Sequence, residues 1–347
     1  MVAIVTGNGL GLERSSGQVL GSKGQLGDAS FGTQGENVTV NAATGNLVIE
    51  RTDEIVIGQG PDSVIHSVYN SLGSYNGLGA NGTAGAWQLS VQRHLTALPA
   101  TPNSANSTIT LSDWDGSDVV YTYDASRTAY VSTEGPGAYD TITYRTSDSM
   151  WLWQDGNTRI TETYGATGDL RTVTDIDGIT ITYPAVNGTS ATVTDATGYT
   201  FEKTAIPSGA NLTLGQLTTT LSSGPNVTRT YYTYDSASRL ASIITDLTPT
   251  DNSIVDNNYV VTTYTYVDST SHLISSIAQT GGARLDFTYD ASNRVTSITQ
   301  TIATGIGEKT GASLIRKYDR RAQLAGPASL SCQSVNSGAQ YIIDRQV

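Results

Sequence analysis

One stretch of this chain occurs twice, and the repetition constrains the fold more than any other feature. Residues 287–299 read FTYDASNRVTSIT, and residues 232–244 read YTYDSASRLASII. In both copies, alternating aromatic and polar residues lead to an aspartate, three small residues follow, and alternation resumes after an arginine. Alternation with a period of two is typical of a half-buried strand, and the interruption is typical of a hairpin turn. The sequence therefore predicts a β-hairpin unit that recurs along the chain.

The residues of the unit suit the parts of such a hairpin. We expect the Asp290 carboxylate to accept hydrogen bonds from the backbone of its own turn, and Asn293 to adopt the left-handed conformation that ends such loops. Arg294 has a long stem that can lie along a neighbouring tyrosine ring. One hairpin cannot bury both of its faces, so each copy must gain stability by packing against the next copy.

Weaker copies of the unit occur at 264–268, 121–127, 163–170 and 317–320. From Tyr234 onward the anchor tyrosines are separated by 32, 23 and 29 residues. These intervals are within the range of a structural repeat with variable loops. The predicted repeat anchors are Tyr123, Asp124, Tyr164, Tyr234, Asp235, Arg239, Tyr266, Tyr289, Asp290, Arg294, Tyr318 and Asp319.

The pattern Tyr-x-Tyr-Asp, then Arg followed by Leu or Val, then Ile, resembles the YD repeat of the RHS family, which includes bacterial RHS proteins, insecticidal toxin-complex subunits and animal teneurins. Upstream, the motifs at 45–47, 69–71 and 85–87 are similar to the segment that opens an RHS region. The family's turn usually has glycine before the arginine, where this chain has Ser238 and Asn293, so its repeats are degenerate. The resemblance covers residues 45–320.

The predicted fold is all-β, with short antiparallel hairpins stacked into a curved continuous sheet, either shell-like or an open strip. The composition agrees, because 19 tyrosines, 36 glycines and a charged fraction of 14% favour short strands and turns over helices. We expect a glycine-rich arm at 1–44, an opening β segment at 45–120, a YD-repeat array at 121–320 and an irregular tail at 321–347. For the tail, three readings stay open: a short helix over 312–323, a frayed end, or a segment whose partners lie in a longer chain.

The RHS resemblance implies a hollow shell that encloses a C-terminal toxin or effector. The chain contains no recognisable effector domain and no Asp-Pro pair of the kind expected at the family's self-cleaving boundary. The first functional hypothesis is therefore a non-catalytic scaffold, part of a secreted or surface-exposed polymorphic-toxin-type protein whose effector partner lies elsewhere in a longer chain.

The alternative hypothesis is a cell-surface protein that binds glycans. Its candidate stacking residues are Trp114, Trp151 and Trp153, because a flat aromatic face suits a sugar ring. Trp151 and Trp153 lie two residues apart and so share one face of a strand. Large aromatic residues are mostly buried, so a role in the core is favoured for this pair.

The sequence predicts no catalytic residue, cofactor-binding residue or metal ligand, and we expect no enzyme activity. The three histidines are isolated from one another, and no G-x-S-x-G motif is present. The turn at 175–178 has only part of a calcium-loop pattern, and the run at 7–12 lacks a glycine needed for dinucleotide binding. A glycosidase with two carboxylates stays a third hypothesis, but spacing selects no pair.

Charge and hydropathy limit the partners and the location. The net charge of −12 argues against binding to nucleic acid or an anionic membrane. No run of about 18 apolar residues predicts a membrane span. The N-terminus has no basic region of the Sec type, so the expected secreted or cell-surface location requires another route. The single cysteine, Cys332, excludes an intramolecular disulfide.

Overall fold

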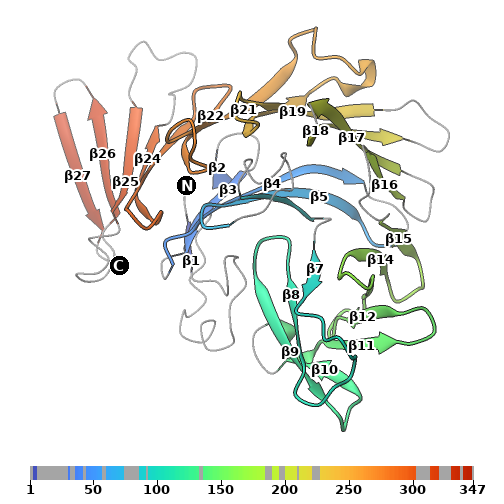
Figure 1. The fold of residues 1–347 in the computed structure, drawn as a ribbon. Helices are drawn as coiled ribbons and strands as arrows, with labels where there is room; N and C mark the ends of the chain where they lie inside the picture. Colours follow the sequence, from blue (N-terminus) through green and yellow to red (C-terminus); the bar gives the residue numbers. More distant parts are fainter. Residues whose placement is uncertain are drawn as a thin grey trace.

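The fold of the chain is built from β-strands and short 3₁₀ turns (Figure 1). No α-helix occurs in the part of the chain that the structure describes, and the all-β prediction is confirmed. The computed structural model describes residues 3–5, 30–31, 36–41, 44–56, 60–73, 86–90, 93–132, 136–183, 190–194, 200–208, 211–220, 227–301, 313–319, 330–336 and 339–345.

The first strands form a small N-terminal sheet in the order β1-β3-β4-β5-β6, with β2 paired to β3. All of its pairings are antiparallel except β1 with β3, which is parallel. The strands are β1 (Ala3–Val5), β2 (Ser30–Phe31), β3 (Glu36–Asn41), β4 (Leu47–Val56), β5 (Ser63–Asn70) and β6 (Trp87–Leu89).

The remaining strands form one long antiparallel sheet, in which every strand from β7 to β27 pairs with the next strand along the chain. This order is the continuous sheet of hairpins that the repeat predicts. Its strands are β7 (His94–Thr96), β8 (Thr108–Ser112), β9 (Asp118–Asp124), β10 (Ala129–Val131), β11 (Thr141–Arg145), β12 (Met150–Gln154), β13 (Thr161–Tyr164), β14 (Leu170–Thr174), β15 (Thr180–Thr182), β16 (Ser190–Thr194), β17 (Thr200–Ser208), β18 (Asn211–Thr220), β19 (Val227–Tyr234), β20 (Leu240–Asp246), β21 (Tyr259–Tyr266), β22 (Ile274–Gln279), β23 (Arg284–Tyr289), β24 (Val295–Thr301), β25 (Ser313–Asp319), β26 (Leu330–Asn336) and β27 (Ala339–Arg345).

The beginning of the long sheet curls until β7 meets the turn before β14, which makes a closed β7–β14 ring. His94 forms a β-bridge with Asp169, and the Leu95 amide donates to the Gly168 carbonyl at 2.9 Å. Apolar side chains fill the ring, among them Ile109, Tyr121, Tyr130, Ile142, Trp151 and Trp153. The ring therefore has its own hydrophobic core.

The strands after the ring curve around the N-terminal sheet (Figure 1). A second hydrophobic core combines residues of both sheets, such as Ile49 and Trp87 of the N-terminal sheet with Ile243, Ile277 and Ile298 of the long sheet. All five side chains are at most 2% exposed. The N-terminal sheet thus covers the apolar face that the β19–β24 hairpins could not bury alone.

A buried polar network crosses the interface between the two sheets. Arg51 of β4, which is 3% exposed, donates from Nε to Asp53 at 2.8 Å and from Nη1 to the Glu36 carboxylate at 3.4 Å. Tyr232 donates to Asp53 at 2.7 Å and Tyr264 donates to Glu36 at 2.8 Å, both from the long sheet. Each buried carboxylate therefore has at least one partner in each sheet, which fixes the relative position of the two sheets.

The structure places strands in segments that the sequence analysis assigns to the arm and the tail. The tail at 321–347 is not irregular, because it contributes strands β26 and β27. The helix considered for 312–323 is wrong, since β25 occupies Ser313–Asp319. The division between the N-terminal sheet and the long sheet falls between β6 and β7, before residue 120, and β3 lies within the segment predicted as an N-terminal arm.

We expect the substitution Arg51→Met to lower the free energy of unfolding by about 3–5 kcal/mol, because it leaves two buried carboxylates without their cation. Urea denaturation measures the loss. The matched control is Arg145→Ala, which removes an exposed ion pair with Asp148 and should cost less than about 1 kcal/mol. Similar losses in the two variants would contradict the structural role of the network.

A second expectation concerns the closure of the ring. Gly168 has a φ of +90°, and a Cβ at this position would lie 2.0 Å from the Leu95 carbonyl oxygen. Gly168→Ala should therefore destabilise the protein and speed hydrogen exchange at the Leu95 amide. Gly178 also has a positive φ, of +81°, but a Cβ there meets no atom within 4 Å, so Gly178→Ala is the control for backbone strain alone. Equal destabilisation by both substitutions would argue against close packing at Gly168.

Candidate functional site

The turn of the repeat unit is held by its aspartate. One oxygen of Asp290 accepts hydrogen bonds from the backbone amides of Ser292 and Arg294 at 2.9 and 3.1 Å, and the other accepts from Arg294 Nε at 2.8 Å. Led by the Arg294 side chain, these donors lower the pKa of Asp290 to about 2. Asn293 has a φ of 60°, the left-handed conformation expected from the sequence.

The copy at 232–244 has the same geometry. Asp235 accepts from the backbone amides of Ala237 and Arg239 and from Arg239 Nε, at 2.8–2.9 Å. Ser238 has a φ of 61°, which matches Asn293. In both copies the register of the ladder shifts at the anchor tyrosine, Tyr234 or Tyr289, so each unit contains a β-bulge at the same place.

Anchor side chains also connect each unit to its neighbour. The Tyr266 hydroxyl donates to the Leu240 carbonyl at 2.8 Å, and the Tyr289 hydroxyl donates to the Ile274 carbonyl at 2.7 Å. In each case the acceptor lies at the start of the second strand of the preceding hairpin. Arg239 reaches in the opposite direction, because its guanidinium stacks 4.2 Å from the Tyr266 ring centroid and donates to the Asp268 carbonyl at 2.6 Å. These contacts are the repeat staple.

The weaker anchors depart from this pattern in different ways. Tyr164 has the β-bulge but lies in the ring, where its hydroxyl donates to the Glu162 carboxylate. Tyr123 pairs directly with Tyr130 without a bulge, and Asp124 accepts from the Ser126 amide at 2.8 Å. Tyr318 and Asp319 pair with Ile298 and Ser297 at the end of β25, and their side chains lie outside the described structure.

Two of the three candidate glycan-stacking residues are not accessible. Trp151 and Trp153 are only 3% and 5% exposed. The Tyr144 ring lies 4.7 Å from Trp151, and the Arg93 guanidinium lies 4.4 Å above Trp153. Both tryptophans therefore belong to the core of the ring, and their assignment as glycan-stacking residues is corrected. Trp114 is half-buried and stacks on His66 at 4.7 Å.

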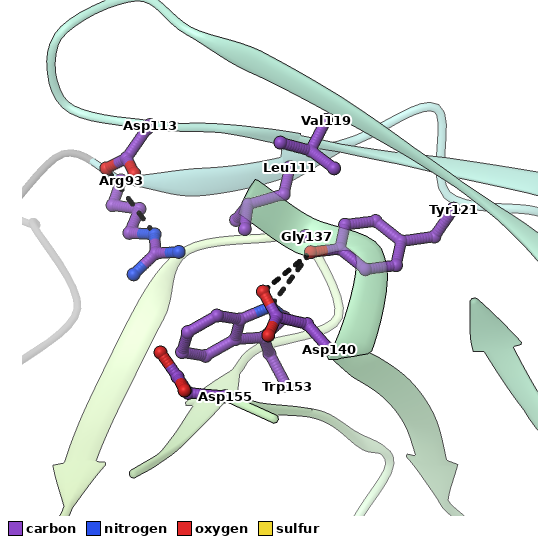
Figure 2. A pocket seen from close by; sticks show the side chains of 9 residues that line it. All are labelled: Arg93, Leu111, Asp113, Val119, Tyr121, Gly137, Asp140, Trp153 and Asp155. Carbon is purple, nitrogen blue, oxygen red and sulfur yellow. Dashed lines mark hydrogen bonds and ion pairs between the residues drawn. The ribbon is translucent and has the colours of Figure 1, made fainter. Parts of the chain in front are cut away.

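A cavity of about 190 Å³ lies in the ring, between turns that are distant in sequence (Figure 2). Arg93 precedes β7, Asp113 follows β8, Asp140 follows the 3₁₀ turn at Pro136–Tyr139, and Asp155 follows β12. No sequence motif marks this site, because its polar residues come from four separate turns and follow no regular spacing. Only the closure of the ring brings them together.

Around the cavity, Arg93 has carboxylate partners, whereas Asp140 has no cationic partner among the described residues. Arg93 donates from Nη1 to Glu162 at 2.7 Å, and its Nε lies 3.5 Å from Asp113. Asp140 accepts from the Gly156 amide at 2.8 Å and has only a long 3.4 Å contact from the Tyr121 hydroxyl. Burial raises the pKa of Asp140, and the charge of Asp155 raises it further.

No group of three or more metal-binding side chains occurs among the residues that the structure describes. Within those same residues, no helix has the length and apolar character needed to cross a membrane.

No family model matches the sequence, and no curated protein matches it. Among solved structures, similar chains occur in the crystal structures of TcdB2-TccC3 without its hypervariable C-terminal region and of TcdB2-TccC3, at 10% and 12% identity with TM-scores of 0.31 and 0.28. The matches cover 86% and 90% of this chain but only 22% and 21% of the others, so the chain spans about a fifth of the length of the structures it matches.

The two best copies of the unit provide a matched test of the repeat staple. Arg239 is 8% exposed and contacts the next unit, so Arg239→Ala should cost about 2–3 kcal/mol of unfolding free energy through its lost charged hydrogen bonds. Arg294 is about half exposed and bonds only to its own Asp290 among the described residues, so Arg294→Ala should cost less than about 1 kcal/mol. Equal costs in urea denaturation would mean that the contact with the next unit adds no stability.

Proposed function

We propose that the protein is a non-catalytic YD-repeat scaffold, a section of wall in a secreted or surface-exposed protein of the polymorphic-toxin type. The observation that carries this proposal is the repeat staple. Arg239 stacks on the Tyr266 ring of the following unit, and the Tyr266 hydroxyl returns a hydrogen bond to the Leu240 carbonyl. Contacts of this kind fix the position of one hairpin on the next, which is what a continuous wall requires.

The structural hydrogen bonds made by the anchor side chains also support a scaffold role. The carboxylate of Asp290 and the guanidinium of Arg239 are occupied by bonds within the wall. Side chains committed in this way are unsuited to general acid–base chemistry, which needs a proton-transfer group within reach of a substrate. The anchor side chains of the repeat therefore serve to hold adjacent hairpins together.

The enclosed partner is proposed from the RHS resemblance in the sequence. In such a protein, a wall with all strand edges paired keeps a C-terminal effector away from proteases and solvent. Here the concave face of the β19–β24 hairpins is covered by the N-terminal sheet. We accordingly place the effector against other parts of a longer shell, beyond the surface that this sheet covers.

The test uses the protein isolated from its natural source. Intact mass spectrometry should give a mass well above the 36.5 kDa of this chain. Limited proteolysis of the native protein should leave an effector segment uncut, and the same segment should become sensitive once urea unfolds the wall.

Two results would contradict the scaffold proposal. One is a native mass of 36.5 kDa, which leaves no room for an effector in the same chain. The other is an effector segment that proteases remove from the native protein as fast as from the unfolded one, because such a segment is not enclosed.

A further inference from the structure

The cavity in the β7–β14 ring has a surplus of negative charge. Asp113, Asp140 and Asp155 line it, and Glu162 forms an ion pair with Arg93. Among the described residues that line the cavity, Arg93 is the one cation, and its charge is shared between Glu162 and Asp113. No cation in the described part of the chain pairs with Asp140 or Asp155.

Each of these two aspartates has one carboxylate oxygen that accepts no hydrogen bond shorter than 3.4 Å from the described residues. Asp155 Oδ1 accepts from the Asn157 and Thr158 amides, each at 2.7 Å, while its Oδ2 has no partner among the described residues. Asp140 Oδ1 accepts from the Gly156 amide, and its Oδ2 has only the 3.4 Å contact from Tyr121. Buried or partly buried carboxylate oxygens are costly without hydrogen-bond donors, so a ligand that supplies N–H groups would be stabilised here.

The other side chains that line the cavity determine which kinds of ligand can fit. Leu111 and Val119 provide an apolar side, suited to the alkyl stem of a ligand. The Trp153 ring has Arg93 stacked on it at 4.4 Å, which removes a platform on which a sugar ring could lie. A volume of about 190 Å³ accommodates a ligand of a few heavy atoms.

From this arrangement we propose that the cavity binds a small organic cation, an ammonium or guanidinium group on a short alkyl stem. The head group donates hydrogen bonds to Asp140 Oδ2 and Asp155 Oδ2, and the stem lies along Leu111 and Val119. The ligand source is either a free amine or the basic side chain of a peptide, since both present the same chemistry. Binding at this site is separate from the scaffold function of the repeat.

The experiment is a titration of the full chain with n-butylammonium and with methylguanidinium, followed by the indole N–H resonance of Trp153 in NMR spectra. We expect saturable shifts with a Kd on the order of 1 mM for such small ligands. A capped lysine amide tests the peptide source. The neutral 1-butanol has a similar stem without the charge and should give no saturable shift.

The variants Asp140→Asn and Asp155→Asn should each weaken binding about 10- to 100-fold, because each loses a charge-assisted hydrogen bond. Both asparagines keep an oxygen that can accept from the backbone amides now bonded to the aspartates, so the turns are retained. The control Asp148→Asn changes an acid whose side chain is 43% exposed and outside the cavity, and it should leave the Kd unchanged.

Several results would overturn the proposal. These are no saturable shift with either cation, unchanged binding in both cavity variants, equal binding of 1-butanol, or a response only to Ca²⁺ or to methyl glycosides. If Asp140→Asn unfolds, as judged by loss of amide dispersion, Asp155→Asn still decides the outcome.

Discussion

Every hairpin of the long sheet depends on contacts with its neighbours, because a two-stranded unit has one apolar face and two open edges. The ladder of hydrogen bonds closes the edges, but ladders alone do not prevent one hairpin from slipping past the next. The bulge at Tyr234 and Tyr289 fixes the register within each unit. The hydroxyls of Tyr266 and Tyr289 then fix the position of each unit on the preceding one.

The apolar face is covered in two different ways along the chain. In the ring, the sheet curls on itself and its own side chains fill the interior. After the ring, the curvature is wider, and the N-terminal sheet supplies the covering surface. This second arrangement places Arg51, Glu36 and Asp53 between two sheets. The desolvation cost of burying these charges is offset only because the three side chains are paired with one another. The polar network thereby adds specificity to an interface that apolar contacts alone would leave free to slide.

The sequence predicted the parts of the fold that depend on local chemistry. The hairpin, its aspartate-held turn and the left-handed residue at Asn293 follow from a pattern within 13 residues. The ring was not predictable in this way, because its closure joins Leu95 to Gly168, 73 positions apart, and no periodic signal marks that contact. The cavity could not be predicted from the sequence for the same reason. Asp140 and Asp155 are ordinary turn residues in the sequence, and only long-range closure makes them neighbours.

The ring also makes one edge of the long sheet different from the other. A sheet of consecutive hairpins would normally present a free strand at each side, and either side could pair with another chain. Here the outer side of β7 is already engaged by the turn at Gly168 and Asp169. Lateral association with a second molecule is therefore obstructed at this boundary. From this ring, the hairpins of the long sheet follow one another in chain order to β27.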